Sequence, residues 1–157
     1  MKPRMNFYQA APDTIKALSA LESQVQASGL EQCLIELVKT RASQINGCAF
    51  CINMHTQDAR KHGETEARLY LLNAWRESPG YTERERAALA WTEAVTQISE
   101  THAPDDVYEA VRAQFSDAEA VNLTMLIATI NAWNRLAIGF RAVPQIKASV
   151  KADAHAA

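Results

Sequence analysis

Apolar residues recur along most of this chain at steps of three and four positions, the spacing that places them on one face of an α-helix. One such set runs from Ile15 to Val25, and we expect Asp13 to cap this helix and Gly29 to end it. Helix-forming residues are abundant, whereas no segment alternates apolar and polar positions with the period of two that a half-buried strand requires. The pattern therefore predicts an all-α fold.

Capping and turn residues divide the rest of the chain into further helices. Thr82 with Glu85, and Ser116 with Glu119, form the capping-box pattern that marks a helix start. The Asn-Gly pair at 46–47 is a strong stop signal between two helical segments. After the first helix, we expect helices over residues 31–45, 48–63, 65–75, 82–98, 104–115 and 116–139, with a loop at 78–80.

Length and composition narrow the class of protein. The 157 residues fit one domain, and we expect a single helical domain over 1–157, with the segment 1–12 and the tail 144–157 peripheral. The formal net charge of −2 gives no basic surplus for nucleic acid, and no apolar run approaches the ~20 residues of a membrane span. The first residues lack the apolar core of a signal peptide, and three cysteines do not make a secreted disulfide framework. We therefore expect a cytoplasmic protein with no nucleic-acid or membrane partner.

Candidate chemistry is concentrated in the stretch 46–55, NGCAFCINMH. If Cys48 lies in the first turn of a helix, Cys51 follows three residues later and His55 four residues after that, all on the same face. Free N–H groups and the positive end of the helix dipole lower the pKa of a thiol there, and an imidazole one turn on can share its proton. Because the thiolate is the attacking species in disulfide exchange and in peroxide reduction, the stretch predicts a redox dithiol.

Glu36 is a further candidate. It lies on the preceding helix, between the apolar residues Ile35 and Leu37. An antiparallel hairpin that turns at 46–47 would bring Glu36 alongside His55. A partly buried carboxylate beside an imidazole can orient the ring and relay protons.

Other uses of the cysteines stay open from the residues alone. Cys48 and Cys51 could be two small apolar thiols buried in the core. Together with His55 and His62, the two cysteines would make a set of four possible zinc ligands. On one continuous helix, however, His62 would lie several turns from Cys48, too far for a tetrahedral site. The remaining Cys33 has no partner in sequence and is expected to be buried.

The spacing of Glu36, the CAFC motif at 48–51 and His55 resembles the active-site pattern of the carboxymuconolactone decarboxylase superfamily, most closely its AhpD-like alkylhydroperoxidase branch. Eleven residues separate Glu36 from the motif, and three separate the motif from His55. The segments 39–64 and 131–141 are similar to the same branch. The resemblance implies an AhpD-like helical bundle with the C-x-x-C at the N-terminus of a central helix. It also implies a homo-oligomer, a trimer or a hexamer built as a trimer of dimers, and a thiol-dependent peroxidase that uses no haem, metal or other cofactor.

By matching position, the resemblance assigns Glu36 and His55 to a proton relay, often through water, that serves Cys51, and it assigns the resolving role to Cys48. The residues themselves leave the attacking sulfur open, because Cys48 lies nearer the helix N-terminus and Cys51 lies nearer the imidazole. We favour Cys51, since a general base also has to manage protons during O–O cleavage. This chain departs from the best-known members, which are longer and carry a histidine where it has Phe50.

The resemblance thus implies reduction of a hydroperoxide by the dithiol, with a lipoylated or thioredoxin-like protein as the electron donor. Two alternatives stay open at this point: a disulfide reductase or redox-sensing module with the same dithiol, and a non-catalytic helical oligomer whose cysteines are structural or bind zinc. Decarboxylation is a further alternative, but the decarboxylases of the superfamily lack the C-x-x-C.

Overall fold

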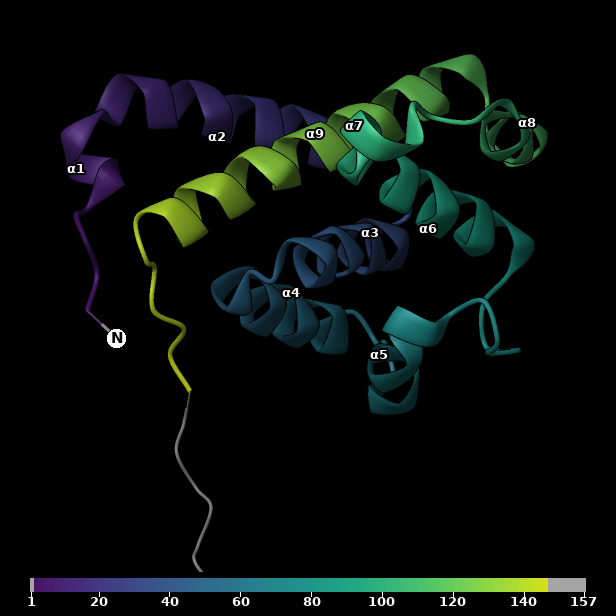
Figure 1. Ribbon diagram of the computed structural model, residues 1–157, viewed down its shortest axis with the longest axis horizontal. Helices are drawn as coiled ribbons and strands as arrows, with labels where there is room; N and C mark the ends of the chain where they lie inside the picture. The colour runs from purple at the N-terminus through teal and green to yellow at the C-terminus, as the bar shows by residue number, and fades with distance from the viewer. Residues whose placement is uncertain (1, 147–157) are drawn as a thin grey trace, which may run out of the picture.

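Helices follow one another through the computed structural model, which describes residues 2–146 (Figure 1). No strand is assigned within these residues, and the predicted all-α class is confirmed. None of the helices in this range has both the length and the hydropathy needed to cross a membrane. Most of the tail 144–157, which we expected to be peripheral, lies outside the described residues. In chain order the elements are α1 (Phe7–Ala10), α2 (Pro12–Gln26), α3 (Gln32–Asn46), α4 (Ala49–Lys61), α5 (Glu66–Leu71), the 3₁₀ helix η1 (Leu72–Ala74), α6 (Glu83–Thr96), α7 (Ile98–Thr101), α8 (Asp105–Gln114) and α9 (Asp117–Gly139).

Capping residues set most helix boundaries as the sequence predicts. The Thr82 hydroxyl accepts a hydrogen bond from the Glu85 N–H, the Glu85 carboxylate accepts one from the Thr82 N–H, and a second such box opens α9. Gly47 ends α3 in the left-handed region, with a φ of 69°. A residue with a Cβ would be strained there, so glycine fixes the sharp turn between α3 and α4.

Several expected boundaries differ from the structure, including the end of the first helix, which lies at Gln26 and not at Gly29. α2 begins at Pro12, whose missing N–H is no loss in the first turn, so Asp13 lies inside the helix and does not cap it. The helix expected over 65–75 is divided into α5 and η1, because the chain tightens into a 3₁₀ turn at Leu72. The helix expected over 82–98 ends at Thr96, before the separate turn α7.

α3 is the element around which the others pack. It contacts α4, α6 and α9, and it forms an antiparallel hairpin with α4 about Gly47. Figure 1 shows the 23-residue α9 crossing beside α3, with α2 running along its other side. α6 and α8 pack together at the end of the bundle away from α1. This arrangement places α4 and α9 against the same central helix.

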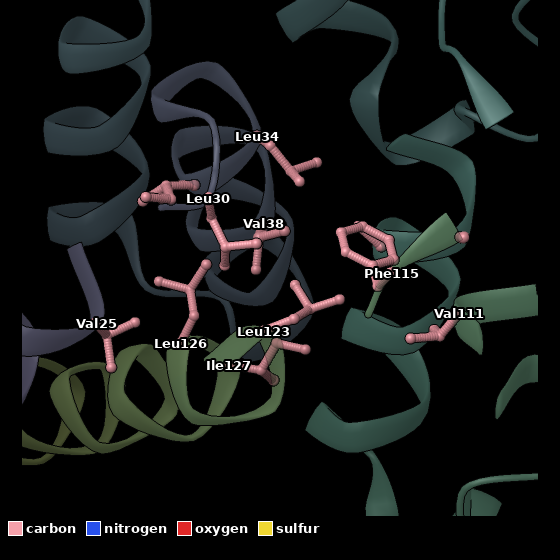
Figure 2. Close-up of a cluster of buried hydrophobic side chains, with 12 residues drawn as sticks. Val25, Leu30, Leu34, Val38, Val111, Phe115, Leu123, Leu126 and Ile127 are labelled. Atoms are coloured by element: carbon pink, nitrogen blue, oxygen red, sulfur yellow. The ribbon is translucent and has the colours of Figure 1, made fainter. Parts of the chain in front are cut away.

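The largest core cluster joins α3 to α9 and to the helices at the far end of the bundle (Figure 2). Leu34 and Val38 from α3 and Leu123 and Leu126 from α9 belong to it, and Phe115 closes one side. Burying one such side chain stabilises the fold by roughly 1.5–3 kcal/mol. The cluster therefore fixes the register of α9 against α3, and with it the residues that α9 presents to α4.

The N-terminal segment is tied to the C-terminal end of α9. The Arg4 N–H donates to the Phe140 carbonyl at 2.9 Å, and the Arg4 guanidinium donates to the Gly139 carbonyl at 2.8 Å. A cation at this position complements the negative end of the helix dipole. The ring centroids of Phe7 and Phe140 lie 5.9 Å apart. Within the segment 1–12, which we expected to be peripheral, Arg4 and Phe7 thus lie against the C-terminal end of α9.

Candidate active site

Cys48 and Cys51 lie together at the start of α4. Cys48 is the N-cap residue, and its sulfur accepts a hydrogen bond from the Cys51 N–H at 3.4 Å. The two Sγ atoms are 2.6 Å apart, and both side chains are buried. Because a disulfide requires about 2.05 Å between its sulfurs, a small movement suffices to form one. The pair also lies where free helix N–H groups stabilise a thiolate.

Glu36 and His55 meet across the α3–α4 hairpin. The Glu36 carboxylate and His55 Nδ1 are 2.8 Å apart, and both side chains are buried. The side-chain amide of Gln32 donates to the other Glu36 oxygen at 3.0 Å. A histidine whose Nδ1 is held by a carboxylate presents Nε2 as its free nitrogen, which is the arrangement of an oriented proton acceptor. The structure thus brings together the two residues that the hairpin argument pairs.

The two thiols have pKa values that are shifted in opposite directions. The Cys51 thiol hydrogen-bonds to the Cys48 sulfur, and this contact is the main reason why the pKa of Cys48 is lowered to about 7. Backbone N–H groups also lower the pKa of Cys48, whereas its burial opposes the shift. The same hydrogen bond, together with burial, raises the pKa of Cys51. Near neutral pH the pair therefore shares one proton, with Cys48 the favoured thiolate and Cys51 the thiol. The first deprotonation is easiest at the sulfur nearer the helix N-terminus.

Asn134 on α9 is a site residue that the sequence analysis does not identify. Its side chain is fully buried, and its hydrogen bonds to the sulfurs of Cys48 and Cys51 lower the pKa of each. Asn46 donates to the Asn134 side-chain oxygen at 2.9 Å, and the Asn134 amide donates to the Ser43 hydroxyl at 3.0 Å. An asparagine inside a long apolar helix was the signal in the sequence that could have found it, since a buried amide needs partners.

A cavity lies on each side of the dithiol. The first, of about 330 Å³, is lined by Cys51, His55 and Glu36 and by aromatic rings. The second, of about 570 Å³, is lined by Cys48 and by residues near the C-terminal end of α9. Phe50 lines both cavities, so an apolar ring stands at the position where the sequence resemblance leads us to expect a histidine. Cys51 shares its cavity with the imidazole, and Cys48 does not.

The structure does not assemble the zinc site that counts both dithiol cysteines, His55 and His62. His62 is the C-cap residue of α4, at the opposite end of that helix from Cys48. Among residues 2–146, the one group of three metal-ligating side chains with ligand atoms within 4.8 Å of one another is Glu36, His55 and Asp58. This group contains neither sulfur, so its donor set differs from that of a structural zinc site.

Cys33 stands apart from the dithiol. It lies in the first turn of α3 and is partly exposed, so the expectation that it is buried is wrong. The core-facing residues of α3 begin only at Leu34, which leaves this turn at the surface. The Cys33 thiol donates to the His62 carbonyl at 3.4 Å.

A buried ion pair beside the site was also missed by sequence reasoning. Lys39 of α3 is 1% exposed and pairs with Glu22 of α2. Both residues line the cavity that Cys51 and His55 share. A lysine within a helix is usually solvated, and the periodicity of α3 alone does not distinguish this one.

The hydrogen bond from Cys51 makes the reactivity of Cys48 depend on pH. Alkylation of Cys48 by iodoacetamide should increase as the pH rises through about 7, because the thiolate is the reacting form and the pKa of Cys48 is lowered to about 7. In Cys51→Ala the main donor is lost, the pKa should return toward ~8.5, and the rate at pH 7 should fall roughly tenfold. Mass analysis of peptides after timed alkylation measures the rate, with Cys33 as the internal reference. An unchanged profile in Cys51→Ala would contradict the prediction.

Comparison with known proteins identifies relatives of this chain. The model of the carboxymuconolactone decarboxylase family matches residues 12–94, a range that includes Glu36, the dithiol and His55. The uncharacterised protein YdfG of Bacillus subtilis (strain 168) is 44% identical over 138 residues, which cover 88% of this chain and 94% of that protein.

Solved structures share the arrangement of helices. A protein of unknown function from Agrobacterium tumefaciens, for which the role of antioxidant defence protein AhpD has been put forward, aligns with a TM-score of 0.91 and 53% identity. The alignment covers 93% of this chain and 100% of that one. An uncharacterised peroxidase-related protein from Ralstonia eutropha JMP134 with an alkylhydroperoxidase AhpD core gives a TM-score of 0.78. At 21% identity, over 88% of this chain and 74% of that one, this second likeness shows the fold alone.

Proposed function

Because the chain belongs to the carboxymuconolactone decarboxylase family and to its AhpD-like branch, we propose that it is a thiol-dependent peroxidase that reduces hydroperoxides. The observation that carries the proposal is the cavity shared by Cys51, His55 and Glu36, with the Cys48 sulfur 2.6 Å from the Cys51 sulfur. A nucleophile, an imidazole held by a carboxylate and a second thiol are the groups that a two-thiol peroxidase needs.

The dithiol supplies the two electrons for cleavage of the O–O bond. Near neutral pH the pair carries one proton, held mainly by Cys51. Transfer of that proton to His55 leaves Cys51 as a thiolate beside the cavity. Its sulfur attacks the terminal oxygen of ROOH, and the S–O bond forms as the O–O bond breaks. The leaving alkoxide takes a proton from His55 and departs as the alcohol.

Cys48 completes the oxidative half of the cycle. Its thiolate attacks the sulfur of the Cys51 sulfenic acid, the new S–S bond displaces hydroxide, and protonation gives water. One hydroperoxide and two thiols thus yield one alcohol, one water and one disulfide, without a further cofactor. An external dithiol protein, lipoylated or thioredoxin-like, then restores both thiols by exchange. In this proposal the working form of the protein is a homo-oligomer, either a trimer or a hexamer.

The low pKa of Cys48 favours the opposite assignment, in which Cys48 attacks the peroxide. The cavities favour Cys51, because Cys48 opens to a separate space that neither His55 nor Glu36 lines. A proton acceptor within reach of the reacting oxygens matters for both bond breaking and product release. The proposal therefore keeps Cys51 as the peroxidatic sulfur, His55 as the proton acceptor and Cys48 as the resolving thiol.

Stopped-flow oxidation of the fully reduced protein by an alkyl hydroperoxide tests the proposal. We expect mass analysis to find one Cys48–Cys51 disulfide per chain, and continuous turnover once a dithiol reductant is added. His55→Asn removes the proton acceptor and should slow the oxidation about 100-fold, at the lower end of general acid–base effects. The matched control His62→Asn, at the far end of α4, should oxidise at the wild-type rate.

Two outcomes of this experiment would count against the proposal. A protein that reduces a model disulfide but forms no disulfide with hydroperoxide would be a disulfide reductase or a redox sensor. An oxidation rate that His55→Asn leaves unchanged would remove the Glu36–His55 pair from the mechanism. Thermal unfolding of both histidine variants shows whether the fold is intact.

A further inference from the structure

The cavity beside Cys51 is walled by aromatic rings. Tyr8 on α1 and Trp133 on α9 have ring centroids 6.4 Å apart, and Phe7 stacks on Tyr8 at 4.5 Å. Phe50 lines the same space. At about 330 Å³, the cavity lies at the small end of ligand sites, which span roughly 300–1,000 Å³. It has room for a ring-sized organic group next to the sulfur.

The outer wall of this cavity is held by defined contacts. Asn6 caps α1, since its side-chain oxygen accepts from the Tyr8 N–H at 3.1 Å. Arg4 anchors the preceding backbone to the end of α9. Tyr8 itself is 53% exposed, so its ring lies at the mouth of the cavity and not in the core. A large exposed ring that lines a cavity can contact an apolar ligand there.

The charged groups around the cavity are mainly acidic. Glu22, Glu36 and Asp58 line it, and Lys39 is the one lysine or arginine among its lining residues. The Lys39 ammonium is already paired with Glu22, and His55 is already bound to Glu36. An anionic ligand would therefore meet carboxylates without a free cation to bind it, which is unfavourable in a site with little solvent.

We propose that this cavity binds the organic part of an uncharged hydroperoxide that carries an aromatic or comparably flat apolar group. The inference rests on the proposed function, because the cavity holds that group beside the Cys51 sulfur. The ring packs against Tyr8 and Trp133. A carboxylate on the substrate finds no unpaired cation, because Lys39 is paired with Glu22 and Lys61 with Asp58. Hydrogen peroxide reaches the same sulfur but gains no binding energy from the walls.

Three hydroperoxides that differ in one feature test this specificity. Cumene hydroperoxide has a phenyl ring, tert-butyl hydroperoxide has a methyl group in its place, and 4-carboxycumene hydroperoxide adds a negative charge to the ring. We expect kcat/KM to be at least ~10-fold higher for cumene hydroperoxide than for either of the others, the scale set by burial of a ring. Equal values for all three would overturn the inference and leave the proposed function standing.

Tyr8→Ala, with Tyr108→Ala as its matched control, assigns the preference to this cavity. Both tyrosines are exposed, at 53% and 45%, and their ring centroids lie 6.4 Å and 6.1 Å from those of Trp133 and Trp91. Tyr108 lines a different cavity, on α8. Tyr8→Ala should reduce the preference for cumene over tert-butyl hydroperoxide several-fold, and Tyr108→Ala should leave it unchanged. Equal effects of the two substitutions would overturn the inference.

Binding of 2-phenyl-2-propanol, the alcohol formed from cumene hydroperoxide, gives a readout that needs no turnover. Calorimetry on the reduced protein should detect binding that weakens several-fold in Tyr8→Ala and not in Tyr108→Ala. This result would support the cavity assignment even if hydroperoxide turnover, and with it the proposed function, failed. Binding that is absent, or that is as strong for the 4-carboxy derivative, would overturn the inference.

Discussion

Cys51→Ser and Cys48→Ser should each abolish hydroperoxide turnover with an added dithiol, a loss of at least ~10³-fold, because each removes one of the two sulfurs that cycle. The two variants should fail at different steps. In Cys48→Ser, a sulfenic acid forms on Cys51 but no internal thiol resolves it, so dimedone should label Cys51. In Cys51→Ser, the cavity that His55 lines contains no thiol, and no sulfenic acid should form at a comparable rate. Peptide mass analysis after a single oxidation distinguishes the two cases.

Cys33→Ser is the matched control for both cysteine variants. Cys33 is partly exposed and lines neither of the cavities beside the dithiol, so its substitution should leave turnover at the wild-type rate. A dimedone adduct on Cys48 in Cys51→Ser, with none on Cys51 in Cys48→Ser, would reverse the roles of the two sulfurs. Wild-type turnover in both dithiol variants would exclude the dithiol from the mechanism.

The Glu36–His55 contact shows which part of the site local sequence can predict. Gly47 supplies a left-handed φ that reverses the chain, and the capping residues around it define two helices that must then run antiparallel. Counting residues from the turn places Glu36 near His55 with no knowledge of the rest of the fold. The C-x-x-C spacing likewise places both sulfurs on one helical face. These are short-range consequences of backbone geometry, and the structure bears out the contact at 2.8 Å.

Other parts of the site depend on tertiary packing that the sequence pattern does not specify. Asn134 and Trp133 reach the dithiol because core contacts fix how α9 lies on α3. α9 is apolar around most of its circumference, so periodicity does not determine which face meets the cysteines. Tyr8 lines the cavity beside Cys51 only because the N-terminal segment folds back onto the end of α9.

The direction of the cysteine pKa shifts is a further property that spacing alone leaves open. Helix position favours a thiolate at Cys48, and the imidazole favours one at Cys51. The contact between the two sulfurs determines which cysteine becomes the thiolate. One proton shared over 2.6 Å stabilises the thiolate at Cys48 and disfavours it at Cys51. The outcome depends on distances of tenths of an ångström, which follow from the packed structure.

Glu22→Ala should destabilise the protein by about 3 kcal/mol, because it leaves the Lys39 ammonium buried without its partner. Lys39 is 1% exposed, and removing one member of a buried ion pair costs roughly 3–5 kcal/mol. We expect the lower end of this range for two reasons. Glu22 is 19% exposed, and its second carboxylate oxygen is buried without a hydrogen bond, so the substitution also removes one unsatisfied acceptor.

The double variant Glu22→Leu/Lys39→Met separates the charge of this pair from its packing. It replaces the ion pair by apolar side chains of similar size, so it should recover most of the stability that Glu22→Ala loses. Lys61→Met is the control, since Lys61 is 70% exposed in its pair with Asp58 and its loss should cost less than about 1 kcal/mol. Urea unfolding gives the free energy of each variant. If Glu22→Ala lowers the free energy of unfolding no more than Lys61→Met does, water must reach the Lys39 ammonium. The cavity beside Cys51 would then contain a cation that an anionic substrate could bind.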